Sequence, residues 1–245
     1  MSKIIKVNKS ITLKFEDRKI NLPNELKENI EKFWKDAVKD NPNLYNGQDY
    51  VVEKVNETEN KIEMLVVKSD YSHYLYNERV GIQQEKYRCC SPWGGILLLT
   101  KDNYFVIGEM NSTTSIPYGL QIAGGGIDVA DIENGAINIE SNIKRELKEE
   151  LGVSVEIVFK IGVVSDYYNL IHRHNINNYF LCKVEFFGEK ELTEDEINNF
   201  HLSTLKLSYE EAIREYEYRS NTRLGKLIAN RELPVLHRAK EIIDI

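Results

Sequence analysis

The chain has 245 residues, of which 42% are hydrophobic and 29% are charged, and its formal net charge at pH 7 is −7. This length and composition predict a globular protein with one large domain, or with one ordinary domain and a smaller companion. No stretch approaches the roughly 18 apolar residues of a membrane span, so we expect no membrane partner. Nucleic acids are bound by clustered Lys and Arg, so the negative charge argues against a nucleic-acid partner as well.

The amino-terminal residues and the cysteines predict a cytoplasmic protein. Residues 1–15 alternate apolar and polar side chains, which is typical of a strand and not of a signal peptide. Cys89, Cys90 and Cys182 are too few and too badly spaced for a disulfide framework or a zinc site.

Residues 1–88 are expected to form a small α+β domain. A helix is predicted from Pro23 and Asn24 to Asn41, because its apolar residues recur at spacings of three and four. The polar, tyrosine-rich stretch 69–88 is expected to be a loop, and the domain boundary is placed near Arg88. Strands are predicted at 4–10, 11–17, 18–22, 50–55 and 61–67.

Residues 89–245 are expected to form the larger domain, where a new set of apolar strands begins after Pro92. The last fifty residues are predicted to be largely helical. Strands are predicted at 93–100, 103–110, 118–123, 155–167 and 179–187.

A helix is predicted from about Asn138 to Leu151, with Gly152 as its C-terminal stop. Its apolar residues recur every four positions and form one stripe. Glu146, Glu149 and Glu150 fall within an arc of roughly 100° on a helical wheel and so share a face. Three carboxylates on one turn repel each other, and a cation should offset that repulsion.

Two interpretations of these carboxylates follow from the sequence. In the first, which the charge pattern alone favours, the helix face is solvated and its charges are balanced by neighbouring Lys144, Arg145 and Lys148. In the second, the carboxylates hold a hard divalent cation such as Mg²⁺, which prefers oxygen ligands.

Three consecutive glycines favour the second interpretation. Gly124, Gly125 and Gly126 follow the predicted strand at 118–123, and glycine permits positive φ and a close approach of the backbone to a ligand. We therefore expect a turn at these glycines that contacts substrate and offers a carbonyl oxygen to the metal.

Residues 145–153, RELKEELGV, resemble the second half of the Nudix box, R-E-U-x-E-E-x-G-U with U apolar, at every fixed position. The first half, G-x5-E-x7, fits poorly, because the expected Glu falls on Ile137 and the expected Gly on Asp131. The glycines lie further upstream, which resembles an insertion in the loop. Four acidic residues are candidates to replace the missing Glu: Asp128, Asp131, Glu133 and Glu140.

The resemblance implies a Nudix-type α/β/α sandwich with a mixed sheet, and hydrolysis of a diphosphate bond in a nucleoside diphosphate linked to another moiety. Glu149 and Glu150 would be the main ligands of Mg²⁺ (or Mn²⁺), Glu146 a further ligand or water orienter, and Arg145 a structural partner of a carboxylate. The metal would neutralise the diphosphate oxygens and activate a water that attacks one phosphorus in line.

The resemblance also implies a general base outside the box, and no single residue is preferred. The candidates are Glu189, Glu191, Glu194, Glu196, His172 and His174.

The substrate is expected to be a nucleotide-type small molecule: a nucleotide-sugar, a dinucleotide or a nucleoside triphosphate. Residues 41–47, NPNLYNG, together with 69–71 and Gly81, are similar to the leading domain of two-domain UDP-sugar Nudix hydrolases, although a plain turn before a hairpin explains them too. The alternative function is a Nudix-like binding or regulatory module that does not hydrolyse its nucleotide, as the missing Glu suggests. An edge of the N-terminal sheet would allow pairing into a homodimer.

Overall fold

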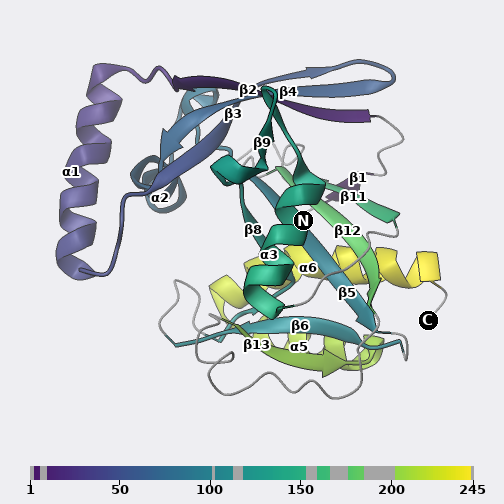
Figure 1. The fold of residues 1–245 in the computed structure, drawn as a ribbon. Coiled ribbons are helices and arrows are strands. Elements are labelled where there is room, and N and C mark those ends of the chain that lie inside the picture. The colour runs from purple at the N-terminus through teal and green to yellow at the C-terminus, as the bar shows by residue number, and fades with distance from the viewer. Residues whose placement is uncertain are drawn as a thin grey trace.

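The computed structural model describes residues 3–5, 10–100, 103–112, 118–152, 159–165, 176–184 and 202–243. These residues form an α+β fold built on two sheets (Figure 1). Within these ranges no helix has the length and apolar character needed to cross a membrane.

The larger sheet has eight strands and is mixed, as the resemblance to the Nudix family implies. β12 (Ile176–Val184) and β5 (Pro92–Thr100) are parallel, whereas the other pairs are antiparallel. Two short strands pair with members of this sheet: β7 (Leu120–Gln121) pairs with β6 (Phe105–Met110), and β8 (Ala123–Gly126) pairs with β5. The order of the other six is β1 (Lys3–Ile5), β11 (Phe159–Ser165), β12 (Ile176–Val184), β5 (Pro92–Thr100), β6 (Phe105–Met110) and β13 (Leu202–Leu207).

Helices cover both faces of this sheet, because side chains along β5 alternate between two cores. Ile96 and Leu98 belong to a buried cluster with the apolar stripe of α3 (Ile139–Leu151). Leu97 and Leu99 belong to a second cluster with buried residues of α5 (Tyr209–Arg219) and α6 (Arg223–Ile243). The larger part of the chain is therefore an α/β/α sandwich.

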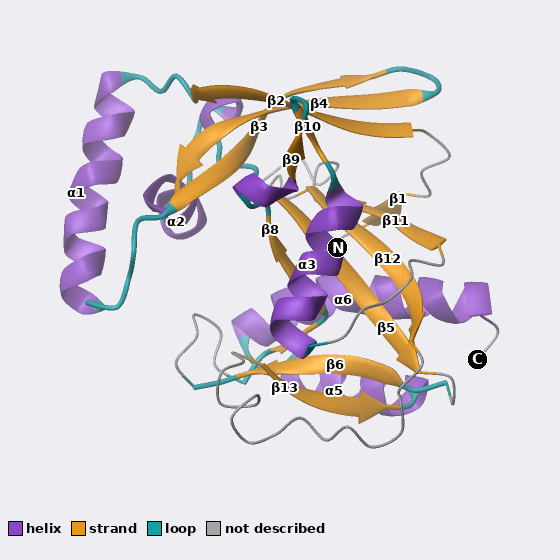
Figure 2. Ribbon diagram, viewed as in Figure 1, coloured by secondary structure: helices purple, strands orange, loops and turns teal. Residues whose placement is uncertain are grey.

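The smaller sheet has five strands, and two helices, α1 (Asn24–Asp40) and α2 (Tyr71–Arg79), lie beside it (Figure 2). In this sheet β2 (Ser10–Lys19) and β4 (Lys61–Asp70) are parallel. The strand order is β3 (Gln48–Glu57), β4 (Lys61–Asp70), β2 (Ser10–Lys19), β10 (Ala136–Ile137) and β9 (Ile132–Glu133).

Segments on either side of residue 88 share a sheet and a core. β10 comes from the larger segment but pairs with β2 of the smaller one, with Ile137 opposite Leu13. In return, β1 joins the larger sheet by pairing with β11. One buried cluster contains Leu13 and Val66 together with the apolar residues of α3. The domain boundary near residue 88 stays a prediction.

Most predicted elements are present, but the predictions for 18–22 and for 69–88 were wrong. The strands predicted separately at 11–17 and 18–22 are the single strand β2, which ends at Lys19. The stretch 69–88, predicted as a loop, contains α2; its buried residues are Ser72, His73, Leu75 and Asn77, so no apolar stripe indicates a helix. The described part of the last fifty residues is largely helical, as predicted, because α5 and α6 make up most of it, and β13 is a strand that was not predicted.

Candidate functional site

Helix α3 carries the predicted site residues, and its ends are those the sequence predicts. Asn138 is the N-cap, and its Oδ1 accepts a hydrogen bond of 3.1 Å from the backbone N–H of Ser141. Gly152 ends the helix in the left-handed conformation, with φ of 67°. Ile143, Leu147 and Leu151 are buried against the sheet, so the helix is held firmly by its apolar stripe.

The three glycines form strand β8 and not the predicted turn. Gly124 pairs with Gly95 of β5, and Gly125 pairs with Gly94. A Cβ atom at Gly94 would overlap the side chain of Asn142 in α3. The facing glycines make a flat surface on which α3 lies close to the backbone of both strands.

Gly124 and Gly125 are needed for different reasons. Gly124 has a φ of 144°, and a Cβ there would overlap the carbonyl oxygen of Gly94. At Gly125 a Cβ would overlap the carboxylate of Glu146, which lies directly over the strand. Gly126 has open space around the corresponding position.

Two of the three helix carboxylates contact the glycine strand. Glu150 accepts a hydrogen bond of 3.1 Å from the backbone N–H of Gly124. Burial raises the pKa of Glu150 to about 7, and the charges of Glu146 and Glu149 add to the increase. Burial also raises the pKa of Glu146, whose side chain is 14% exposed. The site therefore concentrates negative charge that a cation would stabilise.

Arg145 links the helix carboxylates to the loop that precedes the helix. Its Nη2 lies 2.9 Å from Asp131 Oδ2 and 2.8 Å from Glu146 Oε1, and its Nη1 lies 2.8 Å from Glu149 Oε2. Its Nε also donates to Asp131 Oδ1 at 3.2 Å. Of the four acidic residues proposed to replace the missing Glu, Asp131 is the one that pairs with Arg145.

Asp131 lies at the end of a short 3-10 helix, η2 (Val129–Asp131), and is only 1% exposed. Its carboxylate also accepts hydrogen bonds from the backbone N–H of Asp128 at 2.8 Å and from Asn142 Nδ2 at 3.0 Å. Burial acts to raise the pKa of Asp131, but these hydrogen bonds and the charge of Arg145 outweigh it and lower the pKa.

Asn142 is a site residue that the sequence analysis missed. It is fully buried, and its Nδ2 donates to the carbonyl of Gly126 at 2.8 Å as well as to Asp131. Arg145 Nη2 donates to the same carbonyl at 3.5 Å. An Asn beside the apolar stripe of a helix is unfavourable unless its amide is bonded, which is the signal that could have identified it.

The donor set fits a divalent cation in kind, because Glu146, Glu149 and Glu150 supply the oxygen ligands that Mg²⁺ and Mn²⁺ prefer. In the arrangement described, however, Arg145 pairs with Glu146 and Glu149. Over the ranges given above, no group of three His, Cys, Asp or Glu side chains is placed to hold an ion. Binding of a metal ion would therefore require Glu146 or Glu149 to leave its ion pair with Arg145 and coordinate the ion instead.

The six candidates for the general base lie outside the described residues, so their positions are not part of this site. They are His172, His174, Glu189, Glu191, Glu194 and Glu196.

No protein-family model and no curated protein sequence matches the chain. Its structure is similar to solved structures of Nudix proteins. The Nudix domain of Shewanella oneidensis NrtR, solved with ADP-ribose, has 11% identity and a TM-score of 0.45 over 69% of this chain and 97% of that one. A Nudix hydrolase from Nitrosomonas europaea has 15% identity and a TM-score of 0.40, over 62% and 90%. An ADP-ribose pyrophosphatase from Streptococcus suis has 18% identity and a TM-score of 0.37, over 61% and 92%. These similarities concern the fold alone.

Proposed function

We propose that the protein is a Nudix-type diphosphohydrolase that uses Mg²⁺ or Mn²⁺ to cleave a nucleoside diphosphate linked to another moiety. One observation carries the proposal. Helix α3 brings Glu146 and Glu150 onto the glycine strand, with Glu149 beside them, so that negative charge gathers at this strand, whose last residue, Gly126, has open space around it. A nucleotide-sugar, a dinucleotide such as ADP-ribose, or a nucleoside triphosphate would supply the diphosphate.

Each residue has a distinct role in this proposal. Glu146, Glu149 and Glu150 would hold the ion, and Gly124 would orient Glu150 through its N–H group. Arg145 and Asp131 would position Glu146 and Glu149 through their shared contacts. When bound, the ion would neutralise the diphosphate oxygens and make a water more acidic. The backbone of Gly124–Gly126 would lie along the substrate.

The test replaces Glu149 and Glu150 together by Gln, which keeps the shape of both side chains but removes their charge. We expect Mn²⁺ binding, followed by electron paramagnetic resonance, and turnover of a panel of UDP-sugars, ADP-ribose, diadenosine polyphosphates and nucleoside triphosphates to be lost together. Glu140→Gln is the matched control, because Glu140 is exposed at the start of the same helix. Normal turnover by the double variant would disprove the metal assignment.

A second function, nucleotide binding without hydrolysis, is favoured by the pairing of Arg145 with two of the three carboxylates. A binding module of this kind would retain a nucleotide from the panel and release no product with either metal. Product release from any member of the panel would exclude it.

A further inference from the structure

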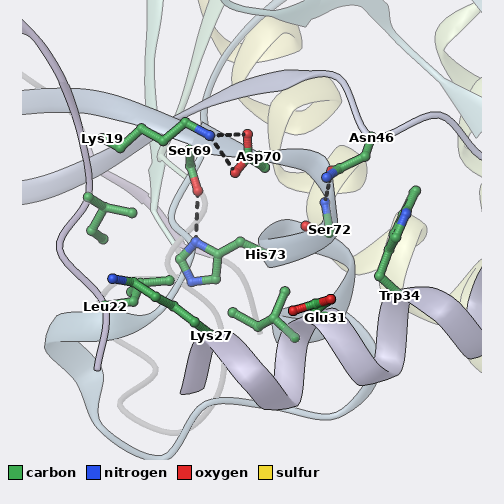
Figure 3. A pocket seen from close by; sticks show the side chains of 12 residues that line it. Lys19, Leu22, Lys27, Glu31, Trp34, Asn46, Ser69, Asp70, Ser72 and His73 are labelled. Carbon is green, nitrogen blue, oxygen red and sulfur yellow. Dashed lines mark hydrogen bonds and ion pairs between the residues drawn. The ribbon is translucent and has the colours of Figure 1, made fainter. Parts of the chain in front are cut away.

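A cavity of about 330 Å³ lies beside α1, away from α3, and the polar groups of its lining bind one another (Figure 3). His73 Nε2 donates to the carbonyl of Tyr87 at 2.9 Å, and its Nδ1 accepts from the Ser69 hydroxyl at 2.8 Å. Both oxygens of Asp70 accept from Lys19 at 2.9 Å. These groups are satisfied by the chain itself and do not point to a ligand.

The buried amide of Asn142 differs from them, because it binds two elements other than its own helix. Its Nδ2 donates to the carbonyl of Gly126, at the end of β8, at 2.8 Å. The same nitrogen donates to Oδ2 of Asp131, at the end of η2, at 3.0 Å. One fully buried side-chain nitrogen therefore joins α3, β8 and η2.

The surroundings of Asn142 fix the orientation of its amide. Both atoms that face Nδ2 can only accept, so the nitrogen must point toward them and Oδ1 away from them. Oδ1 lies against Gly94 of β5, where a Cβ atom would come within 2.3 Å of it. Among the residues that the structure describes, Oδ1 has no hydrogen-bond partner. A buried acceptor without a hydrogen bond costs free energy, so an Asn here points to a role beyond stability.

Arg145 uses the same two acceptors as Asn142. Its Nη2 lies 2.9 Å from Asp131 Oδ2 and 3.5 Å from the carbonyl oxygen of Gly126. Nη2 also lies 2.8 Å from Glu146 Oε1, and Glu146 lies directly over β8. Without the Asn142 amide, Nη2 would be the side-chain donor left beside the Gly126 carbonyl in the described part of the chain. Its closer approach to that carbonyl would move Glu146 with it.

We propose that Asn142 is a positioning residue of the site, which keeps Arg145 and Glu146 in place over the glycine strand. It acts through the Gly126 carbonyl and Asp131 and touches neither the ion nor the substrate. The inference rests on the proposed function, because Glu146 is one of the proposed metal ligands. Side chains that orient the ligands of a metal in this way typically change its affinity by 10- to 100-fold when they are replaced.

The test compares Asn142→Ala with Ile143→Ala in Mn²⁺ titrations followed by electron paramagnetic resonance and in urea unfolding. Ile143 is the next residue of α3, is fully buried and also lies against Gly94, but its side chain forms no hydrogen bond. Ile143→Ala should lower the urea midpoint at least as far as Asn142→Ala, because it removes more apolar volume. We expect only Asn142→Ala to weaken Mn²⁺ binding, by about tenfold or more. A purely structural role would instead make the loss of affinity follow the loss of stability.

Asn142→Thr is a second variant, which covers the case that the alanine variant does not fold. Thr has nearly the volume of Asn, but its hydroxyl is one bond shorter than the amide and cannot reach both acceptors. Circular dichroism should show a folded protein, and Mn²⁺ binding should again be weaker than in the unaltered chain.

The possible failures are distinguishable. Unchanged Mn²⁺ affinity in the Asn142 variants, or an equal loss of affinity in Ile143→Ala, would overturn the role of Asn142 and leave the proposed function intact. Absence of Mn²⁺ binding by the unaltered chain would refute the proposed function, and the role of Asn142 with it.

Discussion

Asp131, Asn142 and Arg145 form a contact in which Asp131 pairs with the arginine of the Nudix-like sequence. The pattern expects Glu at position 137, where this chain has Ile. The structure shows that Ile137 is 6% exposed and lies in the core, while Asp131 reaches Arg145 from η2. Sequence reasoning could only name four candidates, because the conformation of the loop decides which carboxylate comes close to Arg145.

Asp131→Asn should destabilise the protein by about 2–3 kcal/mol at pH 7, because it leaves part of Arg145 without its buried partner. The folded protein lowers the pKa of Asp131, so its contribution is complete above the unfolded pKa of about 4 and is lost as pH falls through the folded value. Urea unfolding at several pH values should therefore show wild type and variant converging below about pH 4.

Glu133→Gln is the control for this experiment, since Glu133 is an exposed residue of β9, two positions after Asp131. It should change the free energy of unfolding by at most about 0.5 kcal/mol. A constant difference between Asp131→Asn and wild type at all pH values would contradict the proposed role of the Asp131 charge.

Alanine substitutions at the three glycines should distinguish the glycine needed for stability from the glycine needed for metal binding. Gly125→Ala should displace the flexible Glu146 carboxylate and weaken Mn²⁺ binding about tenfold or more, with a small loss of stability. Gly124→Ala should cost more than about 3 kcal/mol, because both its φ and the overlap with Gly94 oppose a side chain. Gly126→Ala should change neither quantity. Paired Mn²⁺ titrations and urea unfolding would test this, and unaltered Mn²⁺ binding in Gly125→Ala would contradict it.

At the scale of elements, α3 is predictable and the loop before it is not. Local signals define the helix: Asn138 as its cap, a four-residue apolar repeat, and Gly152 as its stop. By contrast, β9 and β10 have two residues each, and β10 pairs both with β9 and with β2, which lies more than a hundred positions earlier in the chain. Strands this short have no readable period, so their pairing depends on tertiary contacts.

Restoring the acidic residue of the pattern by Ile137→Glu should destabilise the protein by about 3 kcal/mol or more. The new carboxylate would be buried opposite Leu13 without a partner. Ala136→Glu is the control, because successive residues of a strand face opposite sides and Ala136 is only half-buried. Denaturant unfolding of both variants is the measurement. Equal and small effects would show that β10 does not pair with β2 in solution.

At the scale of the whole molecule, the shared core predicts that the two segments unfold together. Trp34 lies in α1 and Trp93 in β5, so single-tryptophan variants report the two segments separately. In each of the variants Trp34→Phe and Trp93→Phe, the urea transition followed by the fluorescence of the remaining tryptophan should coincide with the transition followed by circular dichroism. Because the two signals are compared within one variant, any change in stability caused by the substitution affects both equally. A Trp34 signal that is lost at lower urea than the circular dichroism of the same variant would show that the N-terminal part unfolds independently.

The pairing of β10 with β2 also restricts how this sequence can change over evolution. With Ile137 in the core beside Leu13, a Glu at that position is compatible with folding only if the N-terminal sheet is lost or moves away. Asp131 can be replaced only if another carboxylate already pairs with Arg145. The N-terminal strands and Asp131 are therefore mutually dependent, so a single substitution at position 137 would not give this chain the Nudix pattern.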